Sequence, residues 1–332
     1  MSNAAEYSVA PPTRPVSHDL LPGRGAVPRL HVPEQINRDG EIRPREANPR
    51  VSVVMPTLNE EKNLEWVLGR LPTDLHEVVL VDGRSTDTTI ATALRLRPDI
   101  RIVLQKTRGK GAALALGLAE ATGDIAVVID ADGSMDPAEI PGMVGALLSG
   151  ADVVKGSRAA AGGGSEDLTT LRTLGNWGLT FLANRVYRQH WRELCYGYAA
   201  LWTDVLPLLG ITEITGSARN TAPGAGPAYG HGFEIEAILF CRSARANLRV
   251  AEVFSYEHER RNGESNLATW RDGWRVLTAL RRERHYRFAD ANLNRDRRTY
   301  PLLPHLHDTD RSGASPMDPE PQDAQGTRPA PC

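Results

Sequence analysis

The sequence contains few cysteines, little net charge and no long hydrophobic run. Its three cysteines, Cys195, Cys241 and Cys332, are scattered singly among 332 residues. This usage argues against a disulfide framework or a cysteine zinc site and fits a reducing compartment. The formal net charge of −2 gives no general attraction to polyanions, so we expect no nucleic-acid partner.

Targeting segments are also missing from the sequence. The N-terminus lacks the basic start and apolar stretch of a secretory signal. No window approaches the roughly 20 apolar residues that a membrane-spanning helix needs. We therefore expect a cytoplasmic protein, either fully soluble or peripheral on the inner face of the membrane.

Both ends of the chain differ in composition from the centre. Residues 1–48 and 289–332 are rich in proline and charge and poor in aliphatic residues, so they bury too little apolar surface to offset the entropy of ordering. We predict that both are disordered tails. The folded unit is then expected at residues 49–288, and an overall content of 41% hydrophobic residues is enough for a core.

Short apolar runs alternate with helical patterns in the first half of this unit. The runs at 51–55, 77–81, 100–104 and 125–129 predict strands, and apolar residues at helical spacing predict helices at 59–71, 88–96 and 111–121. This alternation indicates an α/β fold with a doubly wound, mostly parallel sheet and helices on both faces.

The run at 125–129 ends in two carboxylates, Asp130 and Asp132, one residue apart. In an open α/β sheet, ligands bind beyond the carboxyl ends of the strands, and such oxygen ligands suit Mg²⁺ or Mn²⁺ with a diphosphate. A turn that merely stops the strand is the alternative, and the two acids alone do not separate these interpretations.

Other polar residues follow the neighbouring strands. Asn59 and Glu60 come after the first predicted strand and Asp82 ends the second, so a parallel sheet brings them to the same edge as Asp130 and Asp132. The glycine-rich dinucleotide fingerprint and the Walker lysine loop are absent. Gly109-Lys110-Gly111 predicts either a basic turn facing a phosphate or a plain helix entry.

Five stretches of the sequence, taken in order, resemble those of the family 2 glycosyltransferases. Within this family, the resemblance is to the dolichol- or polyprenyl-phosphate sugar transferases. The five stretches are residues 53–61, 81–89, 109–113, 130–132 and 155–158. The resemblance implies a GT-A fold, a nucleotide-diphosphate sugar as donor, and Mg²⁺ or Mn²⁺ as cofactor. The family usually has two adjacent Asp residues at the second strand tip, where this chain has Asp82 and Gly83.

The resemblance also implies a role for particular residues. The tips of the strands at 51–55 and 77–81 would hold the base and ribose. The tip of the strand at 125–129 would take the ribose side and the metal, and basic residues would face the phosphates. The nucleotide-sugar residues are then Pro56, Leu58, Glu60, Asp82, Lys110, Asp130, Arg158 and Arg260, and the metal residues are Asp130, Asp132 and Ser134. Asp132 is in addition expected to be catalytic.

Glu193 is the second residue expected to be catalytic. The segment from Glu193 to Gly197 resembles the acceptor-side motif of the family, in which an Asp usually stands four residues before the Gly. For a hydroxyl acceptor, Glu193 would be the general base of a single inverting displacement, whereas a phosphate acceptor needs no base. An ion pair with Arg185, Arg188 or Arg192 is the structural alternative.

The second half of the unit carries further elements that bear on the acceptor. Segment 159–165 is expected to be a mobile lid, 211–229 a loop insertion, and Arg260 the start of an Arg-x-x-Gly-x-Ser element over the diphosphate. The helix at 168–187 and the closing helix, whose stripe begins at Leu267, either pack on the core or lie on a membrane near a lipid acceptor. At most one of Glu234 and Glu236 is expected to reach the cleft.

The sequence therefore favours a metal-dependent, inverting transfer of a sugar from a nucleotide-diphosphate sugar to an acceptor, preferably polyprenyl phosphate. A glycosyltransferase for a soluble hydroxyl acceptor, a sugar-nucleotide pyrophosphorylase and a non-catalytic sugar-nucleotide-binding protein are the alternatives. A pyrophosphorylase normally has a glycine-rich basic loop where this chain has residues 56–60. The intact Asp130 and Asp132 argue against a non-catalytic protein.

Overall fold

The computed structural model describes residues 34–36, 42–216, 229–263 and 269–286. All of them belong to the first of two compact units, Met1–Ala291, while the second unit, Asn292–Cys332, lies outside the described residues. Most of both predicted tails, most of the predicted loop at 211–229, and Ser265 of the Arg-x-x-Gly-x-Ser element are also outside them.

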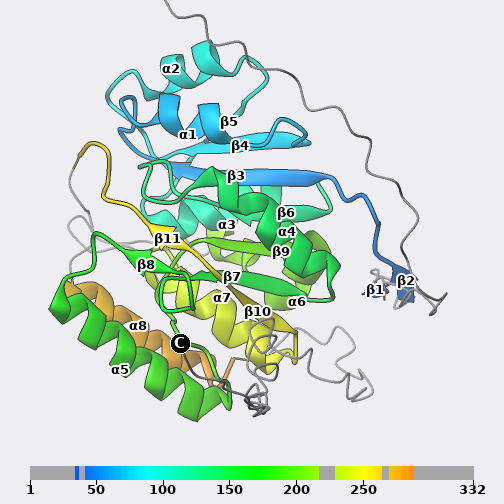
Figure 1. Ribbon diagram of the computed structural model, residues 1–332, viewed down its shortest axis with the longest axis vertical. Helices are drawn as coiled ribbons and strands as arrows, with labels where there is room; N and C mark the ends of the chain where they lie inside the picture. Colours follow the sequence, from blue (N-terminus) through cyan, green and yellow to red (C-terminus); the bar gives the residue numbers. More distant parts are fainter. Residues whose placement is uncertain (1–33, 37–41, 217–228, 264–268, 287–332) are drawn as a thin grey trace, which may run out of the picture. The chain divides into compact units, whose positions relative to one another are not determined.

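A seven-stranded sheet forms the centre of the described fold, in the order β10-β7-β9-β6-β3-β4-β5 (Figure 1). Neighbouring strands are parallel except around β9, which runs antiparallel to both β6 and β7. The predicted α/β fold with a mostly parallel sheet is confirmed. The strands are β3 (Val51–Thr57), β4 (Glu77–Asp82), β5 (Arg101–Leu104), β6 (Ile125–Val128), β7 (Val153–Ser157), β9 (Ala199–Trp202) and β10 (Val250–Phe254).

Helices cover both faces of this sheet, as predicted. Along β3, Met55 packs in one hydrophobic cluster with α1 and α4, while Val54 packs in the other with α3 and α7, because successive strand residues point to opposite faces. The helices are α1 (Leu64–Arg70), α2 (Thr89–Leu96), α3 (Lys110–Glu120), α4 (Ile140–Leu148), α5 (Thr170–Tyr187), α6 (Leu206–Leu209), α7 (Glu234–Arg245) and α8 (Thr269–Glu283). Three short 3-10 helices are η1 (Pro137–Glu139), η2 (Thr203–Val205) and η3 (Thr212–Gly216).

The N-terminal boundary lies earlier than residue 49. Two short antiparallel strands, β1 (Glu34–Ile36) and β2 (Ile42–Pro44), fall within the segment expected to be a disordered tail. Directly after β2, the buried guanidinium of Arg45 pairs with Asp152 at 2.9 Å and Asp204 at 3.0 Å. A composition-based boundary misses this anchor, because a single paired arginine contributes almost nothing to average hydrophobicity.

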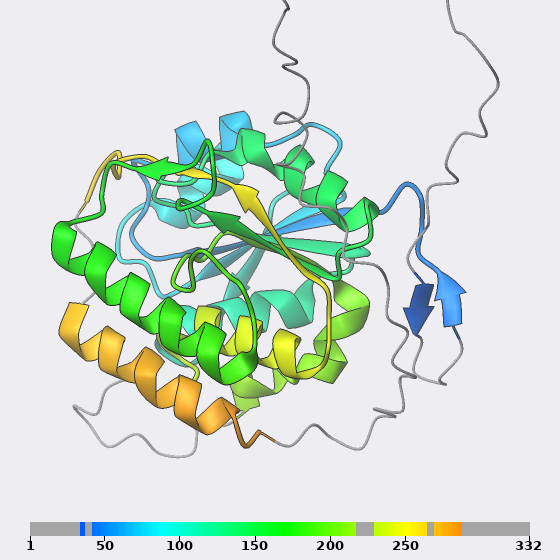
Figure 2. The same ribbon diagram turned by 60° about the horizontal axis from the view of Figure 1, so that its bottom comes forward.

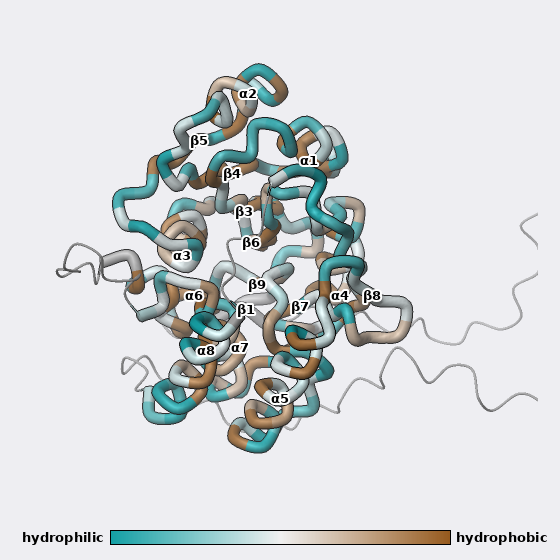
Figure 3. The backbone as a smooth tube through the Cα atoms, turned by 90° about the vertical axis from the view of Figure 1, so that its left-hand side faces the viewer, coloured by the Kyte–Doolittle hydropathy of each residue, from teal (hydrophilic) through white to brown (hydrophobic). Residues whose placement is uncertain are grey.

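Two long helices pack beside each other on the α7 side of the sheet. Figure 2 shows α5 and α8 running side by side, and the Tyr187 hydroxyl near the end of α5 donates to the Leu280 carbonyl near the end of α8, at 2.7 Å. Figure 3 shows hydrophobic positions along α5 as well as in the central strands. Before α5, the predicted lid ends in β8 (Gly164–Ser165), which pairs in parallel with β11 (Tyr256–Glu257).

The register of the parallel strands brings their carboxyl ends to one edge. Thr57, at the end of β3, lies opposite Asp82, at the end of β4. Val128, at the end of β6, lies opposite Val54 of β3. The acidic tips at Asp82 and Asp130 therefore share an edge of the sheet, as the sequence predicted.

Candidate active site

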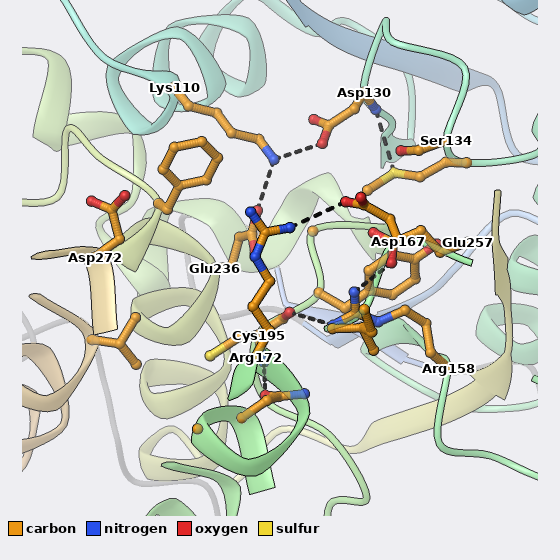
Figure 4. A pocket seen from close by; sticks show the side chains of 18 of the residues that line it. Lys110, Asp130, Ser134, Arg158, Asp167, Arg172, Cys195, Glu236, Glu257 and Asp272 are labelled. Atoms are coloured by element: carbon orange, nitrogen blue, oxygen red, sulfur yellow. Dashed lines mark hydrogen bonds and ion pairs between the residues drawn. The ribbon is translucent and has the colours of Figure 1, made fainter. Parts of the chain in front are cut away.

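A pocket lies beyond the carboxyl end of β6 (Figure 4). Its walls come from the β6 tip, the start of α3, the end of β7, helices α5, α7 and α8, and the segment that follows β11. Six of the residues predicted for the site line it together. They are Lys110, Asp130, Asp132, Ser134, Arg158 and Arg260.

Lys110 joins two acids from different elements inside the pocket. Its Nζ lies 2.7 Å from Asp130 Oδ2 and 2.8 Å from Glu236 Oε1 of α7. Gly109 makes this entry to α3 feasible, since its φ is +119° and a Cβ there would lie 2.0 Å from the His231 carbonyl oxygen. The Gly-Lys-Gly sequence is therefore more than a plain helix entry, because it places an ammonium group in the pocket.

The carboxylates around Lys110 and its burial have opposite effects on the pKa of Lys110. Burial lowers the pKa of Lys110, but the carboxylates of Asp130 and Glu236 outweigh this effect and raise it overall. For Asp130, burial raises the pKa most; the neighbouring Asp132 and Glu236 add to the rise, and Lys110 opposes it. The carboxylates near Asp130 thus oppose its ionisation, and Lys110 favours it.

Asp132 is held from both sides. Its Oδ1 accepts hydrogen bonds from the backbone N–H of Ser134 at 2.9 Å and from the Ser134 hydroxyl at 2.7 Å. Its Oδ2 lies 2.8 Å from a guanidinium nitrogen of Arg260. The tight turn after β6 therefore orients the carboxylate, and the basic segment after β11 meets it across the pocket.

Arg158 is fixed at the opposite wall by two glutamates. It contacts Glu193 through its backbone N–H at 2.8 Å and its Nε at 2.9 Å, and Glu257 through Nη1 at 2.7 Å. Glu193 also accepts from Asn176 of α5 at 2.7 Å, and buried Lys155 donates to its backbone oxygen. Burial lowers the pKa of Arg158, but Glu193 and then Glu257 raise it overall.

These contacts bear on the two interpretations of Glu193. Glu193 as a whole residue is 1% exposed, and it does not line the pocket. It forms an ion pair, as the structural alternative required, but with Arg158 instead of Arg185, Arg188 or Arg192. A base role remains a prediction for a hydroxyl acceptor only.

The predicted base and ribose residues lie outside the walls of this pocket. Pro56 is part of β3, Leu58 is exposed beyond it, and Asp82 is buried, where it accepts from the backbone N–H groups of Arg84 and Ser85. Glu60 lies nearer to the acids: burial, followed by Asp132 and Asp130, raises its pKa to about 7 against the opposing effect of the Asn63 hydrogen bond. Their nucleotide roles stay predictions.

Several pocket residues were not assigned from the sequence. Glu236 reaches the pocket and Glu234 pairs with Arg275 of α8, so the expectation that only one of these two acids would reach it is confirmed. No sequence signal pointed to Glu257, which belongs to the two-residue strand β11, or to Arg172 and Asn176, which lie on the inner side of α5.

The carboxylates of Asp130 and Asp132 fit a divalent cation that is shared with a diphosphate. Among the described residues, no three His, Cys, Asp or Glu side chains are grouped to hold a metal by themselves. Mg²⁺ typically uses one or two carboxylates together with substrate phosphates and water, so two acids beside basic side chains are a suitable donor set.

The chain is similar in sequence to known glycosyltransferases. Residues 52–208 match the family model "Glycosyl transferase family 2". An uncharacterised glycosyltransferase of Mycobacterium tuberculosis is 41% identical over 117 residues, 35% of this chain and 52% of that protein, so the chain spans about half of that relative. An undecaprenyl-phosphate mannosyltransferase of Micrococcus luteus is 29% identical over 241 residues, 70% of this chain and 93% of that protein.

Solved structures share the fold. Glucosyl-3-phosphoglycerate synthase of Mycobacterium tuberculosis, crystallised with Mn²⁺, UDP and glucosyl-3-phosphoglycerate, superposes with a TM-score of 0.54 at 24% identity, covering 71% of this chain and 80% of that chain. The implied GT-A fold is thereby confirmed. Separately, none of the helices among the described residues has the length and apolarity needed to cross a bilayer.

Proposed function

This chain belongs to glycosyltransferase family 2 through its domain at residues 52–208, and on that premise we propose that it transfers a sugar from a nucleotide-diphosphate sugar to polyprenyl phosphate. The observation that carries the proposal is the pocket itself. Asp130 and Asp132, at the tip of β6, face Lys110, Arg158 and Arg260 within one cavity. Carboxylates for a metal and cations for phosphates are thus present together.

The proposed reaction is a single inverting displacement at the sugar C1. An acceptor phosphate oxygen forms a bond to C1 while the bond from C1 to the donor diphosphate breaks, and the electron pair of that bond leaves with the nucleoside diphosphate. Lys110 and Arg260 hold positive charge where the leaving diphosphate gains negative charge. Since an ionised acceptor phosphate has no proton to lose, the reaction requires no general base.

Asp130, Asp132 and Ser134 would hold a Mg²⁺ or Mn²⁺ ion in this proposal. When bound, the ion takes up negative charge on the diphosphate as the bond to the sugar breaks. Ser134 keeps the Asp132 carboxylate oriented through its two hydrogen bonds. The tips of β3 and β4, with Pro56, Leu58, Glu60 and Asp82, are proposed to receive the base and ribose.

Two features support a lipid phosphate as acceptor. Arg158 faces the pocket while Glu193 is fully engaged behind it, so the acceptor side offers a cation and not a free carboxylate base. Apolar side chains also line the pocket: Leu179 on α5, Val276 on α8, and Leu168 and Phe233 just before α5 and α7. The name of the Micrococcus luteus relative, an undecaprenyl-phosphate mannosyltransferase, points the same way. A peripheral position on the cytoplasmic side of a membrane would accompany such an acceptor.

The test is a transfer assay with the full chain. UDP-, GDP- and dTDP-sugars are supplied with Mn²⁺ or Mg²⁺ and with undecaprenyl phosphate, and the matched control is undecaprenol, which has the same chain but a hydroxyl group. We expect one donor to glycosylate the phosphate and not the alcohol, with inversion at C1 seen by NMR. Transfer to the alcohol or to a soluble hydroxyl would refute the phosphate acceptor and favour Glu193 as base. Transfer only to a small phosphate such as 3-phosphoglycerate would refute the lipid part alone.

A further inference from the structure

The outer side of α5 and α8 is apolar where a surface helix is usually polar. On α5, Trp177 and Phe181 are 66% and 62% exposed and stack with ring centroids 6.0 Å apart. On α8, Trp270 and Trp274 are 80% and 70% exposed. We define the aromatic face as these four residues together with the exposed Leu171 and Leu174.

The spacing of the aromatic face shows that it is a surface on each helix and not a set of scattered residues. Leu171, Leu174 and Phe181 recur at helical spacing on α5, and Trp270 and Trp274 lie one turn apart on α8. The two helices lie side by side, with their C-terminal turns joined by the bond from Tyr187 to Leu280. Contiguous exposed apolar surface of this kind marks an interaction site.

The charge around the aromatic face identifies the kind of partner. Helix α5 contains no acidic residue, and the two acids of α8, Asp272 and Glu283, are both buried. Exposed arginines stand at the C-terminal ends of both helices, Arg185 on α5 and Arg281 on α8. Aromatic side chains with basic residues and no exposed acid are typical of a helix that lies in the interface of an anionic membrane.

The same two helices form a wall of the pocket. Arg172 and Leu179 of α5, and Gly273 and Val276 of α8, line it from the inner side. The pocket is thus separated from the aromatic face by about the thickness of one helix, roughly 10 Å. A phosphate headgroup on a flexible lipid chain can cross that distance without leaving the bilayer completely.

We propose that the aromatic face docks this protein on an anionic phospholipid bilayer, with α5 and α8 lying in the interface and the pocket directly behind them. The use of this face for the entry of a polyprenyl-phosphate acceptor rests on the proposed function, whereas the membrane binding itself does not. The apolar side chains insert among the headgroups, and the arginines bind anionic lipid phosphates.

The test is flotation of the full chain with liposomes of phosphatidylcholine alone or with one-third phosphatidylglycerol. We expect the chain to float with the anionic liposomes. Binding should fall roughly tenfold or more in the double variant Trp177→Ser/Trp274→Ser, and by a smaller factor in Arg185→Gln/Arg281→Gln. The matched controls are Leu104→Ser, which removes a 63% exposed leucine at the edge strand β5, and Arg95→Gln on α2; both should bind like the wild type.

Two results would overturn the inference. One is that the wild type fails to float with anionic liposomes or binds equally in the tryptophan double variant. The other is that light scattering shows a dimer which this variant converts to a monomer, because the aromatic face would then be the interface with a second copy. Transfer to undecaprenyl phosphate in detergent without liposome binding would refute this inference alone. Liposome binding through the aromatic face without any transfer would refute the proposed function alone.

Discussion

Arg260 and Asp132 form an ion pair across the pocket, with nitrogen and oxygen 2.8 Å apart. Asp132 belongs to the tip of β6 in the first half of the fold, and Arg260 to the segment after β11 in the second. The backbone N–H of Arg261 also donates to the Asp132 carbonyl. Asp132, which is proposed to bind the metal, is therefore bound itself by the segment after β11, which is proposed to bind the diphosphate.

Asp132→Asn should lower turnover roughly a thousandfold or more, since a charge contribution of several kcal/mol is lost and each 1.36 kcal/mol is tenfold. The measurement is the rate at saturating Mn²⁺ with the donor identified in the transfer assay. Asp99→Asn, at an exposed residue of the α2–β5 loop, is the control and should leave the rate unchanged. Near-normal turnover of the Asp132 variant would remove the residue from the mechanism.

Lys110→Met should destabilise the fold by about 3 kcal/mol at pH 7, because Asp130 and Glu236 are left buried without their shared partner. Urea unfolding measures this loss, and Lys106→Met, an exposed lysine nearby, serves as control.

The pH dependence of the Lys110 variant has a definite sign. Burial already raises the pKa of Asp130, and without the opposing ammonium group this carboxyl binds its proton more tightly in the folded than in the unfolded chain, so lowering the pH from 7 to 5 should shrink the difference from the wild type. Adding Glu236→Gln should also recover much of the loss. A deficit that is independent of pH and of Glu236 would mean that Lys110 acts through packing alone.

Glu193→Gln separates a positioning residue from a general base. If Glu193 orients Arg158, the variant should raise KM, keep kcat within about tenfold, and resemble Arg158→Gln in kind. A base would instead cost about 10²–10⁴ in kcat and remove the acidic limb of the pH–rate profile. Steady-state kinetics from pH 5 to 9, with whichever of undecaprenyl phosphate and undecaprenol the chain glycosylates, distinguish the two cases.

Glu60→Gln should stabilise the protein at alkaline pH. Burial raises the folded-state pKa of Glu60 from 4.5 to about 7, so folding favours the protonated form. The wild type therefore loses stability as the pH rises from about 4.5 through about 7, by about 1 kcal/mol after allowance for the partial exposure of this side chain.

Urea unfolding in EDTA at pH 4.5 and pH 8 tests this prediction for Glu60. The variant should match the wild type at the lower pH and exceed its stability at the higher pH. An equal difference at both values would show that the carboxyl does not titrate in this window.

Three central strands were predicted correctly because a parallel sheet buries its central strands on both faces. β3, β4 and β6 are covered on both faces, so they appear in the sequence as continuous apolar runs that end in polar residues. β9 was not predicted. The run Ala199–Trp202 is not part of a regular alternation of strands and helices in the sequence. Its antiparallel pairing with β6 and β7 joins residues that are far apart in the chain.

Some of the charged residues of the site could be predicted from local sequence pattern, and others could not. Asp130, Asp132 and Lys110 sit at a strand end and a helix start, so their approach to one edge follows from local pattern and parallel topology. Glu236 and Glu257 lie in elements whose direction no local pattern specifies. The partner of Glu193 was missed because Arg158 is far from it in sequence, whereas the arginines considered were its near neighbours.

The sequence by itself determined the order of strands and helices in the first half of the fold, the polar strand tips and the resemblance to a family. These are properties of short segments and of their spacing. Only the tertiary structure decided that Glu193 faces Arg158, that Lys110 bridges Asp130 and Glu236, and that the apolar stripes of α5 and α8 face outward. Helical periodicity shows that a stripe exists, but burial is a property of the whole fold, because it depends on which distant segments come to cover that stripe.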